Sequence, residues 1–594
     1  MSGRGVGLIA LVVIAGACAP HAAAPSSGPA QAAAADWTES TLARLTVRQK
    51  AAQLMMPRIG SEYMPVGVGS YDRLRYWVRD LEIGGVIIST GPPLETVAKL
   101  NLLQAMATVP LLVSADMEHG PGQILTGGTM LPHGLDIGGA TRFPPLMGLG
   151  ATGDERLAYE LGRITAVEAR AAGVHVVFAP VVDVNNNPAN PIINTRSYGA
   201  EPGLVSRMAV AHVRGLQDHG VIATAKHFPG HGDTHVDSHI DLPFIGVDRA
   251  RVEQIELPPY RAVFEAGARG VMTAHIAFPS LTGDSTPATL HPALVGGLLR
   301  RDLGFDGLVF TDALDMGAIV RRYGSGTAAV MALEAGADVL LQMLPNDVSV
   351  IIDAVVDAVA SGRLSEARLD ESVRRILRAK EDAGLHVGAL VPLDSVSHVL
   401  GIAAHQEVAN EAARRSITAV RNRDGLLPLR GGSVLSIVYT DGFDPYAGRS
   451  FNRELALHLP GLETMLLDAR ADATTLAEMQ ARADAADVVL FSPFIRVAAG
   501  RTELAVAGAV AEAVNALAAR RPLVITAFGN PYVLQQFPAT GSYVVAWAQW
   551  DPVLRAAARA LVGLTPMDGR LPIPIPPLHN IGDGVRVDAV RTAP

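Results

Sequence analysis

Cysteine, lysine and aromatic side chains are scarce in this chain of 594 residues. Cys18 is the only cysteine, so no disulfide can form within one chain. Aromatic residues make up 5% of the chain, and beyond the first residues no apolar run is long enough to span a bilayer. The net charge of −9 argues against binding of nucleic acid and against a general attraction to anionic membranes. The remaining aliphatic, glycine-rich composition is typical of an α/β protein.

The first residues have the pattern of an export signal. A basic residue precedes the apolar run Val6–Gly16, and small residues lead to Cys18. A lone cysteine at this position resembles a bacterial lipoprotein box, in which the lipidated thiol becomes the mature N-terminus. Ordinary cleavage after Ala15-Gly16-Ala17 is the alternative. We therefore predict an export signal over 1–18, a disordered tether over 19–36, and an exported lipoprotein of the bacterial cell envelope.

Short apolar runs alternate with amphipathic stretches over residues 37–386, which predicts repeated strand–helix units of a parallel sheet. Eight runs carry this pattern: Ala52–Met56, Gly85–Ser89, Pro110–Ser114, His175–Pro180, Val221–Lys226, Gly270–Ala274, Gly307–Thr311 and Asp338–Gln342. Several of them lead directly into polar residues: Asp116, Asp183, Lys226, His227, His275 and Asp312. Because the carboxyl ends of the strands form the active-site face of a (β/α)₈ barrel, we expect these side chains at one mouth. A helix N-cap is the alternative role for Asp116 and Asp183.

A second α/β unit is predicted over residues 405–594, after a connecting segment at 387–404. Its expected helices and strands are Gln406–Ser416, Val434–Tyr439, Asp487–Ser492, Glu503–Ala519, Pro522–Ala527, Tyr543–Ala546 and Pro552–Leu564. This unit contains no compact cluster of acid, base or nucleophile. The chemistry is therefore expected in the first unit.

The segment Lys226–His239 concentrates chemically active side chains. It reads Lys-His-Phe-Pro-Gly-His-Gly-Asp-Thr-His-Val-Asp-Ser-His, with a histidine at every fourth position from 227 to 239. On a helix this spacing would suggest a metal site. Pro229, Gly230 and Gly232 argue against a helix, so the segment is interpreted as a strand end followed by a catalytic loop. Lys226 is one of only four lysines beside 45 arginines, which suits hydroxyl recognition but also fits an arginine-biased composition.

Asp312 is the candidate carboxylate partner of this loop. It follows the strand run Leu308–Thr311, where a barrel strand would open onto the mouth. Its alternative role is to cap a helix that begins near Met316, although Asp315 could do the same.

Lys226–His239 and the segment Thr311–Met316 resemble the β-N-acetylglucosaminidase branch of glycoside hydrolase family three, in its two-domain bacterial form. The resemblance covers nearly the whole mature chain and implies a (β/α)₈ TIM-like barrel followed by an αβα sandwich domain. It implies Asp312 as catalytic nucleophile, His239 as general acid/base, and Asp237 as the residue that orients His239.

The same resemblance implies a set of substrate-binding residues. The reaction that it implies needs no metal or other cofactor. Lys226, His227 and Arg196 match the sugar-binding positions, and Asp116 matches the residue that holds the distal hydroxyls. His231 is expected to line the pocket. The segment that follows Asp116 departs from the family pattern Gln-Glu-Gly-Gly-Arg, because here it reads Met-Glu-His-Gly-Pro-Gly and the arginine is missing.

The implied reaction is retaining hydrolysis, which needs a nucleophile and a proton donor beside the leaving oxygen. A histidine with an ordinary pKa of about 6.5 can transfer a proton in either direction near neutral pH. Asp237 lies two residues before His239 and could point to the same side of an extended segment. The implied substrate is a terminal β-linked N-acetylglucosamine, from peptidoglycan fragments or from chitin-derived oligosaccharides.

Four other functions remain open from the sequence. The first is a phosphorylase of the same branch, because a neutral histidine tolerates an incoming phosphate better than a carboxylate would. The second is a β-glucosidase or β-xylosidase whose acid comes from the second domain, for example Glu503. The third is an inactive, anchored glycan-binding protein. The fourth is a metal hydrolase built on the four histidines.

Overall fold

The computed structural model describes residues 37–61, 64–127, 138–344, 348–442, 444–497, 500 and 504–590. Its first part is an eight-stranded parallel sheet in the order β7-β6-β5-β4-β3-β2-β1-β8. The strands are β1 (Met55–Ile59), β2 (Gly85–Ile88), β3 (Leu112–Ala115), β4 (Val176–Val177), β5 (Ile222–Phe228), β6 (Gly270–Thr273), β7 (Leu308–Phe310) and β8 (Leu340–Gln342). A bridge between Phe310 and Val339 joins the end of β7 to the start of β8. The sheet is thus a nearly closed barrel, and the predicted TIM-like fold is confirmed.

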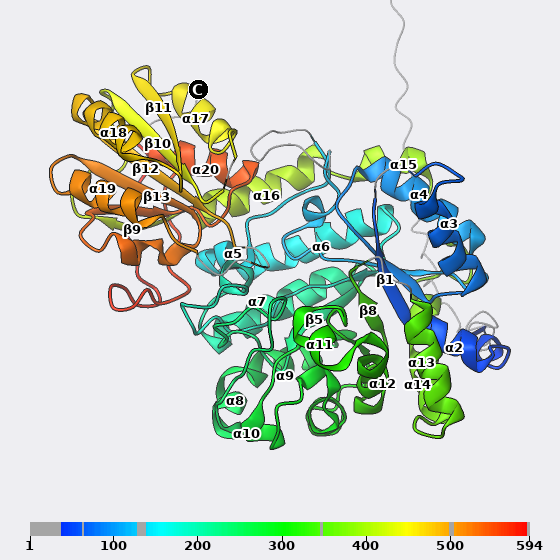
Figure 1. Ribbon diagram of the computed structural model, residues 1–594. Coiled ribbons are helices and arrows are strands. Elements are labelled where there is room, and N and C mark those ends of the chain that lie inside the picture. Colours follow the sequence, from blue (N-terminus) through cyan, green and yellow to red (C-terminus); the bar gives the residue numbers. More distant parts are fainter. Residues whose placement is uncertain are drawn as a thin grey trace, which may run out of the picture.

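Helices surround this barrel on its outside (Figure 1). They are α2 (Val47–Gln53), α3 (Gly69–Arg75), α4 (Pro93–Met106), α5 (Leu146–Thr152), α6 (Glu155–Ala171), α7 (Pro202–Gln217), α8 (Arg249–Ile255), α9 (Leu257–Glu265), α10 (Pro279–Thr282), α11 (Gly317–Tyr323), α12 (Ser325–Ala335), α13 (Ser349–Ala360) and α14 (Glu366–Asp382). Two π-helical stretches, Tyr76–Asp80 and Ala293–Asp302, and short 3₁₀ turns complete the shell. The barrel strands are buried on both faces, as expected of a parallel sheet covered by helices.

The predicted first strand is displaced in the structure. Ala52 belongs to helix α2, and β1 begins only at Met55. Thr46 caps this helix, because its hydroxyl accepts a hydrogen bond from the Gln49 amide while the Gln49 side chain accepts one from the Thr46 amide. This capping box favours a helix over residues whose apolar character alone resembles a strand.

The second part of the chain is a six-stranded sheet in the order β11-β10-β12-β13-β14-β9, with only the β14–β9 pair antiparallel. Its strands are β9 (Thr418–Asn422), β10 (Val434–Thr440), β11 (Leu462–Asp468), β12 (Val488–Ile495), β13 (Leu523–Gly529) and β14 (Ser542–Val545). Its helices are α17 (Arg449–Ala456), α18 (Ala473–Ala485), α19 (Gly508–Ala518) and α20 (Asp551–Leu561). Apolar clusters lie on both faces of this sheet, which agrees with the predicted sandwich.

The connection between the two sheets is structured. The predicted linker 387–404 contains helix α15 (Leu393–Val399), and α16 (Ala403–Ser416) follows at once. Glu168 of α6 is fully buried and accepts hydrogen bonds from Thr141, the Gly401 amide and His405. A charge buried this deeply needs such partners, so Glu168 ties the connection to the barrel.

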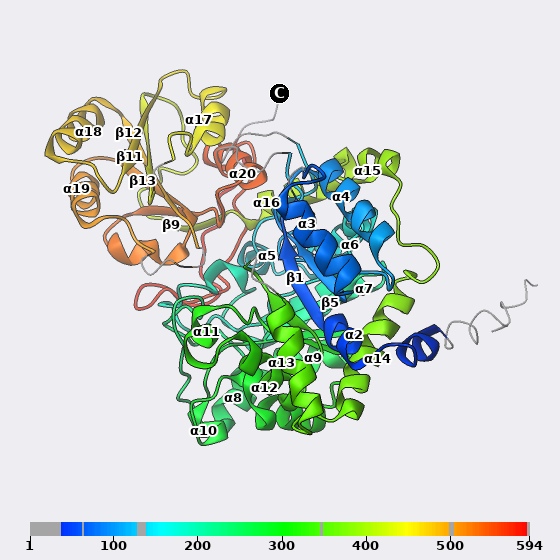
Figure 2. The ribbon, with the colours of Figure 1, turned by 45° about the vertical axis from the view of Figure 1, so that its right-hand side comes forward.

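Helices α5 and α16 lie between the barrel and the second sheet in both views (Figures 1 and 2). Met147 of α5 packs into the apolar cluster of the second sheet. Gly150 of the same helix touches the Tyr198 carbonyl so closely that a Cβ would lie 1.8 Å from that oxygen. Helix α5 therefore packs both on the second sheet and on the barrel segment that contains Tyr198.

Among the described residues, no helix combines the length and apolar character needed to cross a membrane. The expected export signal, Cys18 and the tether over 19–36 lie outside the described residues.

Candidate active site

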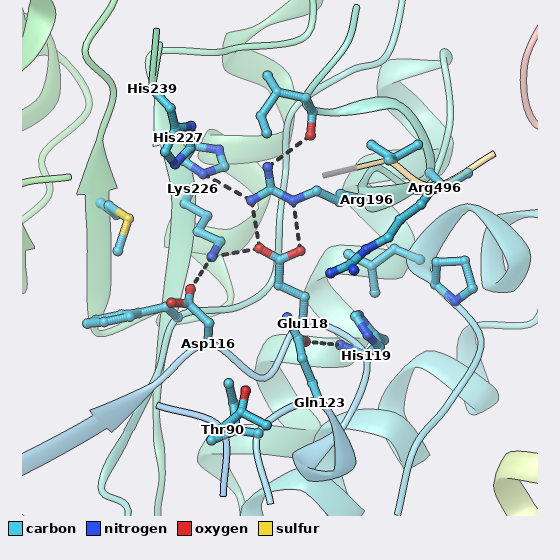
Figure 3. A pocket seen from close by; sticks show the side chains of 18 of the residues that line it. Thr90, Asp116, Glu118, His119, Gln123, Arg196, Lys226, His227, His239 and Arg496 are labelled. Atoms are coloured by element: carbon cyan, nitrogen blue, oxygen red, sulfur yellow. Dashed lines mark hydrogen bonds and ion pairs between the residues drawn. The ribbon is translucent and has the colours of Figure 1, made fainter. Parts of the chain in front are cut away.

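A cavity of about 530 Å³ opens at the carboxyl ends of the barrel strands. This volume suits a small-molecule ligand. Seven of the polar side chains that line it come from widely separated segments: Asp116, Glu118, Arg196, Lys226, His227, His239 and Asp312. All of them except Asp312 are labelled in Figure 3. Six of these residues were predicted from the sequence, and Glu118 was not.

Lys226 forms the floor of the cavity near the end of β5. Its side chain is 2% exposed, and its ammonium group lies 2.8 Å from carboxylate oxygens of both Asp116 and Glu118. Burial lowers the pKa of Lys226, but these two carboxylates raise it more strongly, so the lysine stays charged. Arg196 donates two hydrogen bonds to Glu118, of 2.9 and 2.7 Å. Glu118 thus links the two cations into one network, drawn by the dashed lines of Figure 3.

Asp183 fixes the first histidine of the loop. Its side chain is fully buried and accepts a 2.7 Å hydrogen bond from Nδ1 of His227. The guanidinium of Arg196 can only donate, so it donates to Nε2 of His227, 3.4 Å away. These two contacts fix the orientation of the His227 ring. Asp183 also accepts from the His231 amide and is not a helix cap.

His231 differs from its predicted position, because it is 2% exposed and does not line the cavity. Its ring contacts the hydroxyls of Thr234 and Ser238 at 2.8 and 3.2 Å. Burial lowers the pKa of His231 to about 4, so its ring is neutral. The residue packs behind the loop and supports the segment that carries Ser238 and His239.

Asp237 and His239 form the dyad expected from their spacing. Nδ1 of His239 donates a 2.7 Å hydrogen bond to Oδ1 of Asp237, which also accepts from the His239 amide at 2.9 Å. The Asp237 side chain is 1% exposed, whereas that of His239 is 43% exposed and faces the cavity. This arrangement leaves Nε2 of His239 free to meet a substrate.

The charges around the dyad shift the pKa values of both partners. Burial lowers the pKa of His239, but the hydrogen bond to Asp237 and the negative charge of Asp312 outweigh it, so the pKa lies above its ordinary value of 6.5. Burial raises the pKa of Asp237, but hydrogen bonds from His239 and from the Gly500 amide bring it down to about 2. The dyad is therefore a carboxylate beside an imidazole whose protonated form is favoured.

Asp312 follows β7 and lines the same cavity. Burial raises its pKa, but the imidazoles of His275, His227 and His239 lower it more strongly, and the Ala313 amide donates a 2.8 Å hydrogen bond to it. Asp312 is therefore ionised at neutral pH. Helix α11 begins after Met316, and no side chain caps it, so the alternative role of Asp312 as a cap is wrong.

The second domain contributes to the site. The Gly500 amide donates a 2.7 Å hydrogen bond to Oδ2 of Asp237, the oxygen that His239 does not use. Arg496, Trp547, Gln549 and Trp550 also line the cavity. The barrel sequence gives no signal for these residues, because their positions depend on how the two domains pack.

The four histidines of the loop do not converge on one point. His231 is buried behind the loop, while His235 is exposed. In the part of the chain that the structure describes, no three His, Cys, Asp or Glu side chains are grouped so that they could hold a metal ion. Glu503, the alternative acid, lies outside the described residues.

Comparison with known proteins relates the chain to enzymes that act on glycosides. Residues 133–379 match the model of the glycosyl hydrolase family 3 N terminal domain. The chain is 30% identical over 568 residues to a β-N-acetylglucosaminidase/β-glucosidase of Cellulomonas fimi. The aligned region covers 90% of this chain and 95% of the relative.

Two solved structures share the whole two-domain arrangement. One is a glycoside hydrolase family 3 β-N-acetylglucosaminidase from Paenibacillus sp. str. FPU-7, with a TM-score of 0.79 and 33% identity over 89% of this chain and 99% of that chain. The other is the β-glucoside phosphorylase BglX, with a TM-score of 0.79 and 26% identity over 91% of this chain and 96% of that chain.

Proposed function

This chain belongs to glycoside hydrolase family 3, in its β-N-acetylglucosaminidase branch, and we propose that it removes terminal β-linked N-acetylglucosamine with retention of configuration through an ester on Asp312. The single observation that carries the mechanism is that an ionised Asp312 and His239, whose ring is held by Asp237, line one cavity. Retention needs these two functions, a nucleophile and a proton donor, on the same bound sugar.

In the first step, Asp312 attacks the anomeric carbon and forms an ester bond to it. The bond from that carbon to the leaving oxygen breaks, and Nε2 of His239 gives its proton to this oxygen. The raised pKa of His239 favours the protonated imidazole that this step needs. Asp237 fixes the ring and stabilises its positive charge before the transfer.

In the second step, water replaces the enzyme at the anomeric carbon. The ester on Asp312 is neutral, so one of the charges that raise the pKa of His239 is gone. Neutral His239 accepts a proton from water, the oxygen of that water bonds to the anomeric carbon, and the Asp312 carboxylate is released. The same imidazole therefore acts as acid and then as base.

Sugar recognition is assigned to the charged floor of the cavity. Lys226 and Arg196 carry N–H donors suited to sugar hydroxyls, and Asp116 carries acceptors, with its side chain 34% exposed. His227 adds an Nε2 atom whose orientation is fixed through Asp183. Hydroxyl groups in such a site bind by charge-assisted hydrogen bonds, which are stronger than neutral ones.

The natural substrate is proposed to be a peptidoglycan fragment, met by a lipid-anchored enzyme in the cell envelope. The sequence supports this with an export signal that ends at a lone cysteine, Cys18. Chitin-derived oligosaccharides are the competing source of the same terminal sugar.

The test is activity of the mature chain on 4-nitrophenyl β-N-acetylglucosaminide, with the matching glucoside and xyloside as controls. We expect the N-acetylglucosaminide to be cleaved with the highest kcat/KM, and nuclear magnetic resonance to record the β-anomer of the sugar as first product. A preferred glucoside would overturn the sugar assignment, and an α-anomer would overturn retention.

Phosphorolysis is the second candidate reaction. It is favoured by an acid/base that is an imidazole, because a neutral imidazole does not repel an incoming phosphate dianion, and by the similarity to a β-glucoside phosphorylase. Product analysis with and without inorganic phosphate separates the two: sugar 1-phosphate marks phosphorolysis, and free sugar in the presence of phosphate marks hydrolysis.

A further inference from the structure

The cavity carries more positive than negative charge, although the chain as a whole has a net charge of −9. Among the described residues, five arginine or lysine side chains and three carboxylates line it. Lys226 and Arg196 are paired with Asp116 and Glu118. Arg58, Arg142 and Arg496 also line the cavity, and no ion pair joins any of them to a described carboxylate. A pocket with unpaired arginines is suited to an anion.

Arg142 is held by aromatic contacts, and no carboxylate in the described part of the chain pairs with it. Its guanidinium lies over the ring of Trp550, with Cζ 4.0 Å from the ring centre, and Nη2 donates a 3.2 Å hydrogen bond to Nε2 of His119. His119 itself stacks on Trp550, with ring centres 4.5 Å apart. Nε of Arg142 is buried and donates no hydrogen bond within the described chain. Stacking uses the face of the guanidinium and leaves donors at its edge for a ligand.

The local backbone explains why Arg142 reaches this position. The Gly122 amide donates to the Thr141 carbonyl, and the Phe143 amide donates to the His119 carbonyl, so the two segments lie side by side. Gly120 has φ +100°, and a Cβ there would lie 2.7 Å from the Thr141 oxygen. The segment that departs from the family pattern therefore brings the arginine of another segment beside His119.

Arg496 adds a guanidinium from the other domain that no described carboxylate pairs with. It is exposed toward the cavity, and its charge lowers the pKa of Arg142, after burial, to about 9. Two like charges this close repel each other, and an anion between them would relieve the repulsion. Trp550 also comes from the second domain, and its Nε1 donates to the Phe143 carbonyl at 2.9 Å. The two domains thus build the cluster together.

The cluster is remote from the bond that the proposed function breaks. Figure 3 shows His119 and Arg496 across the Arg196–Glu118 pair from His239. Asp116, three residues before His119, is assigned to the distal hydroxyls of the sugar. A ligand group at the cluster therefore lies at the end of the sugar that points away from the scissile bond.

We propose that Arg142 and Arg496 form an oxyanion subsite for a phosphate, sulfate or carboxylate carried by the distal end of the terminal sugar. The proposal rests on the proposed function and specifies its substrate class as N-acetylglucosaminides that are anionic at C6 or C4. Each guanidinium contributes charge-assisted hydrogen bonds, and His119 accepts one from Arg142 and keeps it oriented.

The first test compares kcat/KM for 4-nitrophenyl N-acetylglucosaminide with its 6-sulfate and its 6-phosphate. The wild type is expected to prefer both anionic substrates, and Arg142→Met and Arg496→Met are each expected to reduce this preference about tenfold or more. Arg430→Met is the matched control, because Arg430 is exposed and does not line the cavity. Comparison of the 6-sulfate with the 6-phosphate shows whether the subsite prefers a singly or a doubly charged substrate group.

A binding measurement separates this proposal from the proposed function. Calorimetry compares N-acetylglucosamine with its 6-phosphate on the wild type and on both variants, and it needs no turnover. Tighter binding of the 6-phosphate that both variants lose supports the subsite even if no glycoside is cleaved. Equal binding of the two sugars, or a preference that survives both substitutions, overturns it. Acceleration by inorganic phosphate alone, lost in both variants, would also overturn it in favour of a phosphate co-substrate.

Discussion

His239 is the residue on which the proposed chemistry depends, and its properties come from three neighbours. Asp237 holds Nδ1, Asp312 adds a negative charge, and the Gly500 amide binds the second oxygen of Asp237. The first two raise the pKa of the imidazole, while Gly500 stabilises the ionised form of Asp237. The pKa of an imidazole in this setting lies above its ordinary value. It falls once Asp312 is esterified, because the negative charge of Asp312 is then gone.

Asp237→Asn should therefore move the pH profile. The first step needs protonated His239, so activity is lost as pH rises through the pKa of His239, which lies above 6.5 in the wild type. Removal of the Asp237 charge lowers that pKa, so the alkaline limb of kcat/KM should shift to lower pH. An alkaline limb that stays in place would contradict the role of Asp237 in the protonation of His239.

Spacing predicted the Asp237–His239 pair, but the expected extended segment is wrong, because the Ile240 amide donates to the Asp237 carbonyl and the pair lies in a turn. Spacing was not sufficient for Glu118 or Asp183. Glu118 joins Lys226 to Arg196, and Asp183 holds His227, across separations of 44 to 108 residues. Such contacts are created by the closure of the barrel, and the only signal was that Asp183 follows a strand run. The ring stack of His119 and Trp550 had no sequence signal at all.

At the scale of elements, the histidine loop is shaped by close backbone contact. A Cβ on Gly232 would lie 1.8 Å from the Val184 carbonyl oxygen, whereas a Cβ on Gly246 would meet nothing within 4 Å. Gly232→Ala should therefore displace the loop and cost about 2 kcal/mol of unfolding free energy, together with a loss of kcat. Gly246→Ala is the control and should leave both quantities unchanged. Urea unfolding and steady-state kinetics check this, and equal stability of the two variants would contradict the contact.

Helix α14 carries a lysine whose charge is buried. Lys380 is fully buried and donates a 2.6 Å hydrogen bond to Gln53, and no ion pair joins it to a carboxylate in the described part of the chain. Burial lowers its pKa to about 7. The unfolded chain keeps the proton up to a pKa of about 10.4, so unfolding takes up a proton between these values.

Lys380 should therefore make stability depend on pH. Above about pH 10 Lys380 is neutral in both the folded and the unfolded state, so it does not lower the unfolding free energy. As pH falls toward 7, stability is lost at up to about 1.4 kcal/mol per pH unit. Lys380→Met should remove this slope. The unfolding free energy of the variant, measured in urea, should therefore increase relative to that of the wild type as the pH falls from about 9.5 to about 7. A difference between the two proteins that does not change with pH would contradict the buried charge.

Most elements were predictable from apolar runs, and the exceptions have physical reasons. Seven of the eight barrel strands overlap their predicted runs closely, while the first is displaced because a capping box favours α2. β11 was missed because it is an edge strand whose side chains are mostly not buried. β9 was missed because it follows α16 directly and pairs antiparallel with a strand about 120 residues later.

At the scale of the whole molecule, the second domain is part of the active site. It contributes the Gly500 hydrogen bond to the dyad and the wall that contains Arg496 and Trp550. The sequence of this domain shows no compact acid, base or nucleophile cluster. Its contribution is made by a backbone amide, a cation and an aromatic ring, which no motif reveals.

Attachment to a membrane is predicted to depend on one side chain, the thiol of Cys18. Cys18→Ser should prevent lipidation, so the exported protein should move from the membrane fraction to the soluble fraction while its specific activity is unchanged. Metabolic labelling with a radioactive fatty acid checks the modification directly. Label that persists in the variant, or a wild type that is already soluble and unlabelled, would contradict the lipid anchor.

The proposed double displacement is tested most directly by trapping its intermediate. His239→Ala removes the base of the second step, while a 2,4-dinitrophenyl N-acetylglucosaminide needs little acid help in the first. Mass spectrometry of the digested protein should then find one N-acetylglucosaminyl group on the peptide that contains Asp312, and none in the double variant that also carries Asp312→Ala. A sugar attached to another residue, or an adduct that survives Asp312→Ala, would contradict the account.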